Sequence, residues 1–254
     1  MEIVLLGTGN TATILGRLFT DAGHRIAQVY GRTPRNADDL AAQLNTVAIS
    51  DPAQLNSNAD VYIIAISDNG IENLVPLFHW NNRTVLHTAG SVSMNVLKPY
   101  TKNYGIIYPL QSLRKENTTP QVIPLLVDAN TNENLTLITD LANSISSHVQ
   151  RATDQERSQY HLAAVFANNF ANHFFTLVQD YCTKMGLDFA FVLPVIQQLT
   201  EKLISIPASQ LQTGPAIRND SQTIARHLEM LQQHPPMADL YKMITESIQQ
   251  HYRL

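Results

Sequence analysis

The sequence predicts an α/β fold: an N-terminal doubly wound parallel sheet over residues 1–152, followed by an all-helical domain over residues 153–254. Short apolar runs alternate with amphipathic segments as far as Gln150, which is typical of parallel strands joined by helices. From Thr153 onward the apolar residues recur at helical spacing, and no further strand is expected. A length of 254 residues is sufficient for two domains.

The first strand and the turn after it carry the most informative motif. Ile3–Leu6 reads as a buried strand, and the six residues that follow, GTGNTA, fit the pattern G-x-G-x-x-[G/A]. An amphipathic helix and a second strand, Ile26–Tyr30, follow at the distance that a dinucleotide fingerprint requires. The first glycine permits a tight turn and the second leaves room for a pyrophosphate, which the free N–H groups of the helix start can bind. The residues expected to bind it are Gly7, Thr8, Gly9, Asn10 and Thr11.

The end of the second strand predicts which dinucleotide binds. An NAD site usually places Asp or Glu here to bond the ribose 2′-hydroxyl, whereas an Arg accommodates a 2′-phosphate. This chain has Gly31, Arg32 and Thr33, and its next acid is Asp38. Arg32 offers a planar, permanently charged fork to a phosphate. We therefore expect NADP rather than NAD, the alternative being that Arg32 is an ordinary solvated charge in a loop.

The other strands of the sheet follow in order, with helices expected near residues 37–44, 71–77 and 134–146. The strands are expected at Val47–Ile49, Asp60–Ile66, Thr84–His87, Gly105–Pro109, Ile123–Asp128 and His148–Gln150. Ligands of such sheets bind beyond the carboxyl ends of the strands. The ends of the strands at Asp60–Ile66 and Thr84–His87 are therefore also predicted to contact the cofactor. The alternative is that their polar residues only form turns. The residues expected to contact the cofactor there are Ile66, Ser67, Asp68, Ala89 and Gly90.

The helical domain begins with an unusually long helix. Helices are expected over residues 154–184, 189–203, 221–232 and 237–251. In the first of them His161, Val165, Asn168 and Asn172 lie close to one line at about 100° per residue, with apolar neighbours. Buried polar groups need partners. The row therefore predicts either hydrogen bonding within the core or a surface that faces a substrate.

Composition argues against several classes of protein. The formal net charge is −4, so no broad basic face for nucleic acid is expected. The longest apolar run, near residues 61–66, is too short to cross a bilayer, and no basic and apolar leader precedes the first strand. The single cysteine, Cys182, cannot form a disulfide within the chain, and the nine histidines show no metal-ligand spacing. We expect a cytoplasmic protein with no metal site and no membrane partner.

Five separated motifs occur in the order of one known family. After the fingerprint come HTAG at residues 87–90, YPLQSL at 108–113, YHLAAVFANN at 160–169 and TGPAIRND at 213–220. This pattern resembles Rossmann-like proteins whose C-terminal half is the helical domain of unknown function 2520, relatives of pyrroline-5-carboxylate reductase and of hydroxyacid and ketopantoate dehydrogenases. The resemblance implies an NADP-binding domain followed by a helical domain that dimerises. Two positions depart from the family pattern: Tyr108 stands where many members carry His, and Asn219 where members commonly carry Gly.

The leading hypothesis is an NADP-dependent oxidoreductase that reduces a small oxo- or imino-acid, because the cofactor then supplies the hydride and the protein a proton. His161 is the candidate proton donor, since an imidazole exchanges protons near neutral pH, and Asn169 would orient the substrate. Arg218 is the candidate clamp for a substrate carboxylate, the alternative being an ion pair with Asp220. His87 is a second candidate donor, although a satisfied histidine at a strand end is the simpler interpretation.

The competing hypothesis is a non-catalytic NADP-binding sensor or scaffold that acts through a helical dimer, since fold alone does not decide function. The long helix expected at 154–184 carries more apolar surface than the three shorter helices of the same chain can readily bury. We therefore expect a homodimer in which the C-terminal helices of two chains pack together. The helical domain should lie over the strand ends, with His161, Asn169 and Arg218 facing Gly90. A third possibility, a structural dimer with a vestigial fingerprint, predicts no cofactor binding.

Overall fold

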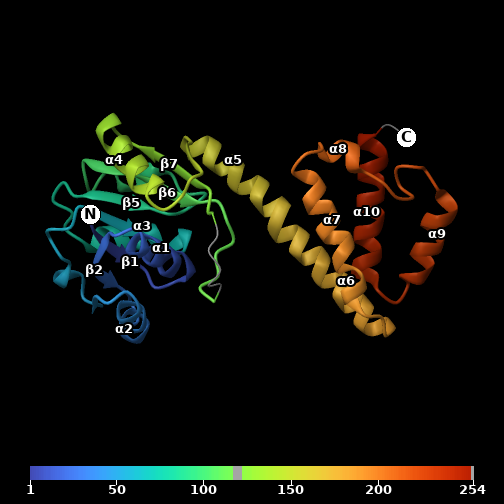
Figure 1. The fold of residues 1–254 in the computed structure, drawn as a ribbon, viewed down its shortest axis with the longest axis horizontal. Helices are drawn as coiled ribbons and strands as arrows, with labels where there is room; N and C mark the ends of the chain where they lie inside the picture. The colour runs from blue at the N-terminus through green and yellow to red at the C-terminus, as the bar shows by residue number, and fades with distance from the viewer. Residues whose placement is uncertain (117–121, 253–254) are drawn as a thin grey trace. The chain divides into compact units, whose positions relative to one another are not determined.

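The computed structural model describes residues 1–116 and 122–252 (Figure 1). The chain forms two compact units, Met1–Asn168 and Asn169–Leu254. The expected domains, 1–152 and 153–254, follow the change from strands to helices, which the structure places at Arg151. The boundary between the compact units lies further along the chain, after Asn168, because the first turns of the long helix pack against the sheet.

The first unit is built on an eight-stranded sheet with the order β3-β2-β1-β4-β5-β6-β7-β8 (Figure 1). Each strand predicted from the sequence is present, within a few residues at its ends. Their bounds are β1 Glu2–Leu6, β2 Arg25–Tyr30, β3 Val47–Ile49, β4 Val61–Ile64, β5 Thr84–His87, β6 Asn103–Pro109, β7 Leu125–Ala129 and β8 Val149–Arg151.

One pair of strands departs from the parallel arrangement. β7 runs antiparallel to β6, with Gly105 opposite Ala129 and Pro109 opposite Leu125, whereas the other neighbours are parallel. A parallel pair needs a crossover, usually a helix, and the described residues of the connection between β6 and β7 contain no helix. The predicted parallel sheet is therefore confirmed with one exception, the β6–β7 pair.

Helices cover both faces of the sheet, as the doubly wound prediction requires. Leu5 on β1 packs in the core that contains Phe19 of α1 and Ile138 of α4, while its neighbour Leu6 packs in the core that contains Ile71 of α3. Alternate residues of a strand point to opposite faces, so a strand buried on both sides reads as a continuous apolar run. The helices of this unit are α1 Asn10–Asp21, α2 Pro34–Gln43, α3 Asp68–Leu74, α4 Asn132–Asn143 and α5 Asp154–Ala164, with 3-10 turns η1 Pro52–Gln54, η2 Val75–Leu77 and η3 Met94–Leu97.

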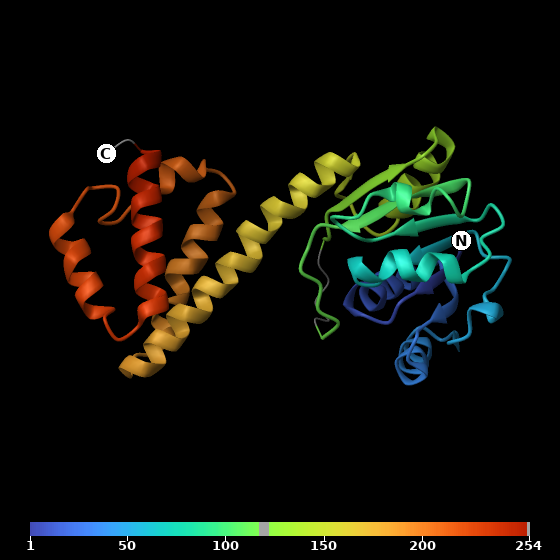
Figure 2. The same cartoon turned by 180° about the vertical axis from the view of Figure 1, so that it is seen from behind.

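The second unit is helical, as predicted (Figure 2). The long helix contains a feature that the sequence did not predict, a π-helical segment over Val165–Phe170 between α5 and α6. Wider turns change the angle between successive side chains, and such segments often occur at functional sites. The short helix α8 was not predicted either. The helices here are α6 Ala171–Met185, α7 Leu193–Leu203, α8 Ala208–Leu211, α9 Ser221–Met230 and α10 Pro235–His251. No helix within the described residues has the length and apolarity needed to cross a membrane.

Candidate active site

A cavity of about 720 Å³ lies at the carboxyl ends of β1, β2 and β4. Ten residues predicted to bind the cofactor line it: Gly7, Thr8, Gly9, Asn10, Thr11, Gly31, Arg32, Thr33, Ile66 and Ser67. Several other lining residues were not predicted, because they belong to no motif. They are Tyr30 at the end of β2 and, on the α2 and α3 sides of the cavity, Asn36, Gly70, Asn73, Leu74 and Leu77.

The two glycines of the fingerprint have different tasks. Gly7 adopts a φ of +132°, and a Cβ on it would lie 2.2 Å from the carbonyl oxygen of Ala65, so the fold itself requires glycine here. Its N–H donates to the carbonyl of Tyr30 at 2.8 Å, which ties the ends of β1 and β2 together. Gly9 precedes α1 with an extended backbone, and no heavy atom lies within 4 Å of the position of its missing Cβ. The space beside Gly9 is therefore open to a ligand.

The charge of the cavity favours phosphate. Arg32 is the only charged side chain among the lining residues that the structure describes, and no carboxylate is present in the lining. Thr33 and Asn36 lie in the same part of the wall and offer polar hydrogen-bonding groups. The start of α1 adds N–H groups and the positive end of a helix dipole. The residues present fit the pyrophosphate and the 2′-phosphate of a dinucleotide.

Three residues predicted to bind the cofactor do not line this cavity: Asp68, Ala89 and Gly90. Asp68 begins α3 and accepts a hydrogen bond from the hydroxyl of Ser91, which joins the strand ends of β4 and β5. Ala89 is buried, and its carbonyl is bonded to a side chain of α5. Gly90 lies in a separate contact with α5 and β6.

This contact brings together Gly90, Tyr108 at the end of β6 and His161 on α5. The Oη of Tyr108 lies 2.8 Å from Nδ1 of His161, and the two rings meet edge to face. A Cβ on Gly90 would lie 2.8 Å from Nδ1 of His161 and 3.0 Å from Cζ of Tyr108. Glycine is therefore needed at position 90 because two polar rings occupy the space. The structure thus places His161 beside Gly90, as the sequence analysis expected.

The phenol of Tyr108 is held in its protonated form. Burial raises the pKa of Tyr108, the negative charge of Asp68 raises it further, and the positive charge of Arg157 offsets part of the effect. A protonated phenol can donate to Nδ1 of His161, which would place the proton of a neutral imidazole on Nε2. The pair thus offers two exchangeable protons in one small cluster.

His87 has a different environment from His161. Its side chain is fully buried at the end of β5, where Nδ1 accepts from the N–H of Ala89 at 3.2 Å and Nε2 lies 3.4 Å from the carbonyl of Ser93. Burial, with a contribution from the Arg157 charge, lowers the pKa of His87 to about 4. Both ring nitrogens are satisfied and the imidazole is neutral at pH 7, so we give His87 no role in proton transfer.

Comparison with known proteins places the chain in a family. Residues 2–89 match the family described as NADP oxidoreductase coenzyme F420-dependent, and residues 123–248 match a domain of unknown function, 2520. A crystal structure of a candidate NADP oxidoreductase from Bacteroides fragilis is 35% identical over 98% of each chain, with a TM-score of 0.91. The chain belongs to this family of Rossmann-type NADP oxidoreductases with a C-terminal domain 2520. The resemblance inferred from the five sequence motifs is confirmed.

More distant structures share the fold of these oxidoreductases. A pyrroline-5-carboxylate reductase from Streptococcus pyogenes is 15% identical, covering 100% of this chain and 99% of its own, with a TM-score of 0.66. An imine reductase from Myxococcus stipitatus, in complex with NADP⁺, is 13% identical over 99% of this chain and 96% of its own, with a TM-score of 0.74. No protein with a curated description matches the chain significantly.

Two family motifs contact each other in the first unit. His161 bonds Tyr108, and the side-chain amide of Asn168 donates to the hydroxyl of Ser112. The part of the helix motif that lies in the first unit, residues 160–168, therefore contacts the end of β6 and the segment that follows it. Two residues of the polar row on the long helix therefore have hydrogen-bond partners within the protein. His161 contacts the end of β6, and Asn168 contacts the loop after it.

Asn169 and Arg218 belong to the second unit, so their meeting with His161 stays a prediction. Arg218 is exposed and takes part in none of the ion pairs found among the described residues. The next residue, Asn219, has a φ of +52°, a conformation that glycine and asparagine tolerate. The replacement of the family's usual Gly by Asn219 therefore preserves the turn. Asp220 then begins α9 by accepting from the N–H of Thr223.

Arg157 is a residue of this region that the sequence analysis missed. It is fully buried, and its Nε donates to the carbonyl of Ala89 at 3.1 Å. The available signal was its position four residues before His161, which places both side chains on one face of the helix. A charged residue in the first turns of a helix reads as solvated, and only the tertiary structure shows otherwise.

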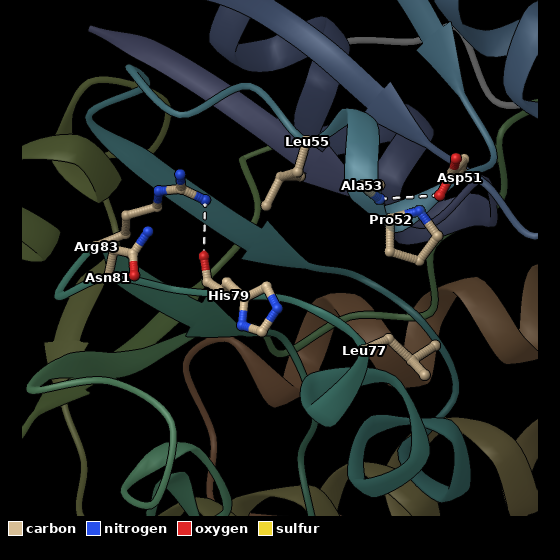
Figure 3. Close-up of a pocket in the computed structure, with 8 residues that line it drawn as sticks. All are labelled: Asp51, Pro52, Ala53, Leu55, Leu77, His79, Asn81 and Arg83. Atoms are coloured by element: carbon tan, nitrogen blue, oxygen red, sulfur yellow. Dashed lines mark hydrogen bonds between the residues drawn. The ribbon is translucent and has the colours of Figure 1, made fainter.

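A second cavity, of about 380 Å³, lies outside the strand ends (Figure 3). Its two charged groups with potential for ligand binding, Asp51 and Arg83, already have protein partners. Asp51 accepts from the N–H of Ala53, while Arg83 donates to the carbonyl of His79 and lies over the ring of Tyr62. We therefore assign no chemistry to this cavity. Among the described residues there is also no cluster of His, Cys, Asp and Glu that could hold a metal ion.

Proposed function

We propose that this protein is an NADPH-dependent reductase of a small oxo- or imino-acid. The observation that carries the proposal is the cavity at the ends of β1, β2 and β4, in which Arg32 is the only charged lining residue and the glycine fingerprint leaves space for phosphates. The cluster of Gly90, Tyr108 and His161 lies at the ends of β5 and β6, in the same sheet. This arrangement matches the rule that such sheets bind ligands beyond the carboxyl ends of their strands.

We assign the following roles to the cofactor and to the residues of the protein. NADPH, when bound, supplies the hydride that adds to the carbon of a C=N or C=O group. The Tyr108–His161 pair delivers a proton to the nitrogen or oxygen of that group, because both side chains are within hydrogen-bond distance of each other and can pass a proton between them. Arg218 would bind a carboxylate of the substrate through its planar fork, and Asn169 would orient the reacting group.

The proposal is tested by mixing the purified protein and NADPH with a panel of small oxo-acids and cyclic and acyclic imino-acids. Loss of the absorbance of reduced nicotinamide with at least one of them is the expected result. Binding of NADPH without oxidation by any member would favour a non-catalytic sensor or scaffold. Absence of NADPH binding by the folded protein would mean that the fingerprint is vestigial.

Arg32 should determine the preference for NADPH over NADH. We expect the wild-type protein to bind NADPH more tightly, and Arg32→Ala to reduce the difference roughly tenfold to hundredfold, because a hydrogen bond to a charged group contributes about 1.5–3 kcal/mol. Calorimetric titration of both cofactors measures the effect. Arg35→Ala, a change at an exposed arginine that does not line the cavity, is the matched control. Equal affinities of the wild-type protein for the two cofactors would contradict the assignment.

We also propose that the helical unit pairs with a second copy of the chain. Among its described residues the buried hydrophobic side chains are only Cys182, Ala216 and Leu231, whereas Phe191 and Ile204 are 85% and 88% exposed. A unit with so small a core of its own needs further apolar burial. A second copy supplies the same apolar helix faces and would form a symmetric interface.

The expected assembly is a homodimer that buries more than about 1,000 Å². Light scattering at micromolar concentration should give twice the mass of the chain, and Ile204→Glu should shift the mass toward the monomer. The control is Val47→Glu, which introduces the same charge at an exposed apolar residue of the first unit. A monomer mass for the wild-type protein would refute the dimer.

A further inference from the structure

Arg157 forms a buried clamp on the loop that follows β5. No part of its side chain is exposed. Its Nε donates to the carbonyl of Ala89 at 3.1 Å, and its Nη2 donates to the carbonyl of Val92. Nη2 also lies 2.8 Å from the carboxylate of Asp154, in the first turn of α5. Nη1 is buried as well and has no hydrogen-bond partner among the described residues.

Such an arginine is a poor means of stabilising a fold. Arg157 is fully buried, while the side chain of Asp154 stays 31% exposed. The cost of removing a charge from water can exceed the attraction of its partner, and buried ion pairs can often be replaced by apolar residues without loss of stability. The unpartnered Nη1 adds a further cost, because a buried donor without an acceptor loses its hydrogen bonds to water. The arrangement therefore points to a geometric requirement at this place.

The contacts of Arg157 and His161, both on α5, indicate what this geometric requirement is. Arg157 and His161 are four residues apart, so their side chains leave the same face of the helix. Arg157 bonds the carbonyl of Ala89, and the ring of His161 lies against the next residue, Gly90. The clamp and the candidate proton donor thus contact consecutive residues of one loop. A shift of this loop along α5 would move Gly90 relative to the ring of His161.

Asp154 holds the other end of the loop. Its carboxylate accepts from the hydroxyl of Ser93 and from the N–H of Met94, the latter at 3.2 Å. Burial raises the pKa of Asp154, but these hydrogen bonds and the ion pair with Arg157 outweigh it and keep the pKa below its usual value. The loop from Ala89 to Met94 is therefore bonded at both ends to one turn of α5.

We infer that Arg157, together with Asp154, is a positioning residue of the candidate active site: it fixes the loop after β5 against α5 and so sets His161 at its contact with Gly90 and Tyr108. The kinetic part of this inference rests on the proposed reductase function, whereas the placement of the His161 ring does not. Arg157 does not line the cavity that carries the fingerprint, so the contacts expected for the pyrophosphate and the 2′-phosphate are independent of it, and NADPH affinity should change much less than kcat.

The test compares Arg157→Lys with Arg151→Lys in the full-length protein. Lysine keeps the charge at position 157 but cannot reproduce the fork that bonds Ala89 and Val92. Arg151 is a matched control, because it pairs with Asp128 through Nε at 3.1 Å but its side chain is 60% exposed. The readouts are kcat, NADPH affinity by calorimetry and the ring nitrogen resonances of ¹⁵N-labelled histidine, with His161 assigned through His161→Gln.

For Arg157→Lys we expect kcat to fall on the order of tenfold to hundredfold, the size of effect that a misplacement of about 1 Å can produce. NADPH affinity should fall much less than kcat, because the expected phosphate contacts are unaffected, and the ring nitrogen resonances of His161 should move. Arg151→Lys should change none of the three. Unchanged His161 resonances and unchanged kcat in folded Arg157→Lys would overturn the inference.

The resonances keep the inference distinct from the proposed function. If no compound of the panel causes the wild-type protein to oxidise NADPH, the reductase proposal fails. The effect of Arg157→Lys on the resonances of the His161 ring then still supports or refutes the positioning role of Arg157. If Arg157→Lys does not fold, Asp154→Asn loosens the same clamp while keeping an oxygen acceptor for the N–H of Met94. Movement of the His161 resonances in that variant would support the inference, and their constancy would contradict it.

Discussion

Replacing His161 with alanine is expected to lower kcat about a hundredfold to ten-thousandfold, the contribution that a positioned proton donor typically makes. The change removes the ring that lies 2.8 Å from Oη of Tyr108 and against Gly90. NADPH affinity should fall much less than kcat, because His161 does not line the cavity that holds the fingerprint. Steady-state kinetics with a substrate found in the imino- and oxo-acid panel, together with calorimetry, measures both.

Two further variants sharpen this prediction. Tyr108→Phe removes only the hydroxyl that bonds His161, so a loss smaller than that of His161→Ala would identify the imidazole as the main donor, and a larger one the phenol. His148→Ala changes an exposed histidine immediately before β8 and should leave kcat at the wild-type value. If His161→Ala and Tyr108→Phe both retain wild-type kcat, proton transfer by this pair is wrong.

Gly7→Ala is expected to cause the largest loss of stability of the variants considered. Alanine at a φ of +132° costs about 1–3 kcal/mol in backbone strain. Its Cβ would lie 2.2 Å from the carbonyl oxygen of Ala65, and such overpacking adds about 1–3 kcal/mol. Because the neighbour is backbone, it cannot rotate away. Chemical denaturation should show the lower free energy of unfolding.

Gly9→Ala is the matched comparison within the same fingerprint. No heavy atom lies within 4 Å of the added Cβ, so the free energy of unfolding should fall by less than about 1 kcal/mol, the cost of alanine at a helix N-cap. NADPH affinity should fall strongly, because the methyl group occupies the space expected for the pyrophosphate. Wild-type NADPH affinity in Gly9→Ala would show that the phosphates lie elsewhere.

Local patterns predicted the strands of the sheet and most of the residues that line the cavity at the ends of β1, β2 and β4. A strand buried on both faces reads as an apolar run, so Ile3–Leu6 and the other strands were visible without tertiary information. The fingerprint and Arg32 lie next to strands in sequence, and a parallel sheet brings such strand ends to one edge. The antiparallel β7 was not predicted, since its direction depends on the connection before it.

Contacts between distant segments could not be read from the sequence. The bond between Tyr108 and His161 joins residues far apart in the chain, and the burial of Arg157 depends on a loop that it meets only after folding. The π-helical segment at Val165–Phe170 changes the angles assumed for the polar row, so a uniform helical period could not place Asn169. For His87 the simpler interpretation from the sequence, a satisfied histidine at a strand end, agrees with its burial and hydrogen bonds.

The most direct test of the proposed function is a crystal structure of the protein with NADPH. We expect the pyrophosphate at the start of α1 beside Gly9, the 2′-phosphate on Arg32 and the nicotinamide next to Gly90, within reach of Tyr108 and His161. The opposite result would be a nicotinamide more than about 12 Å from both of these side chains, too far for proton transfer even through one bridging water. In that case the Tyr108–His161 pair is a structural contact and the proposed chemistry is wrong.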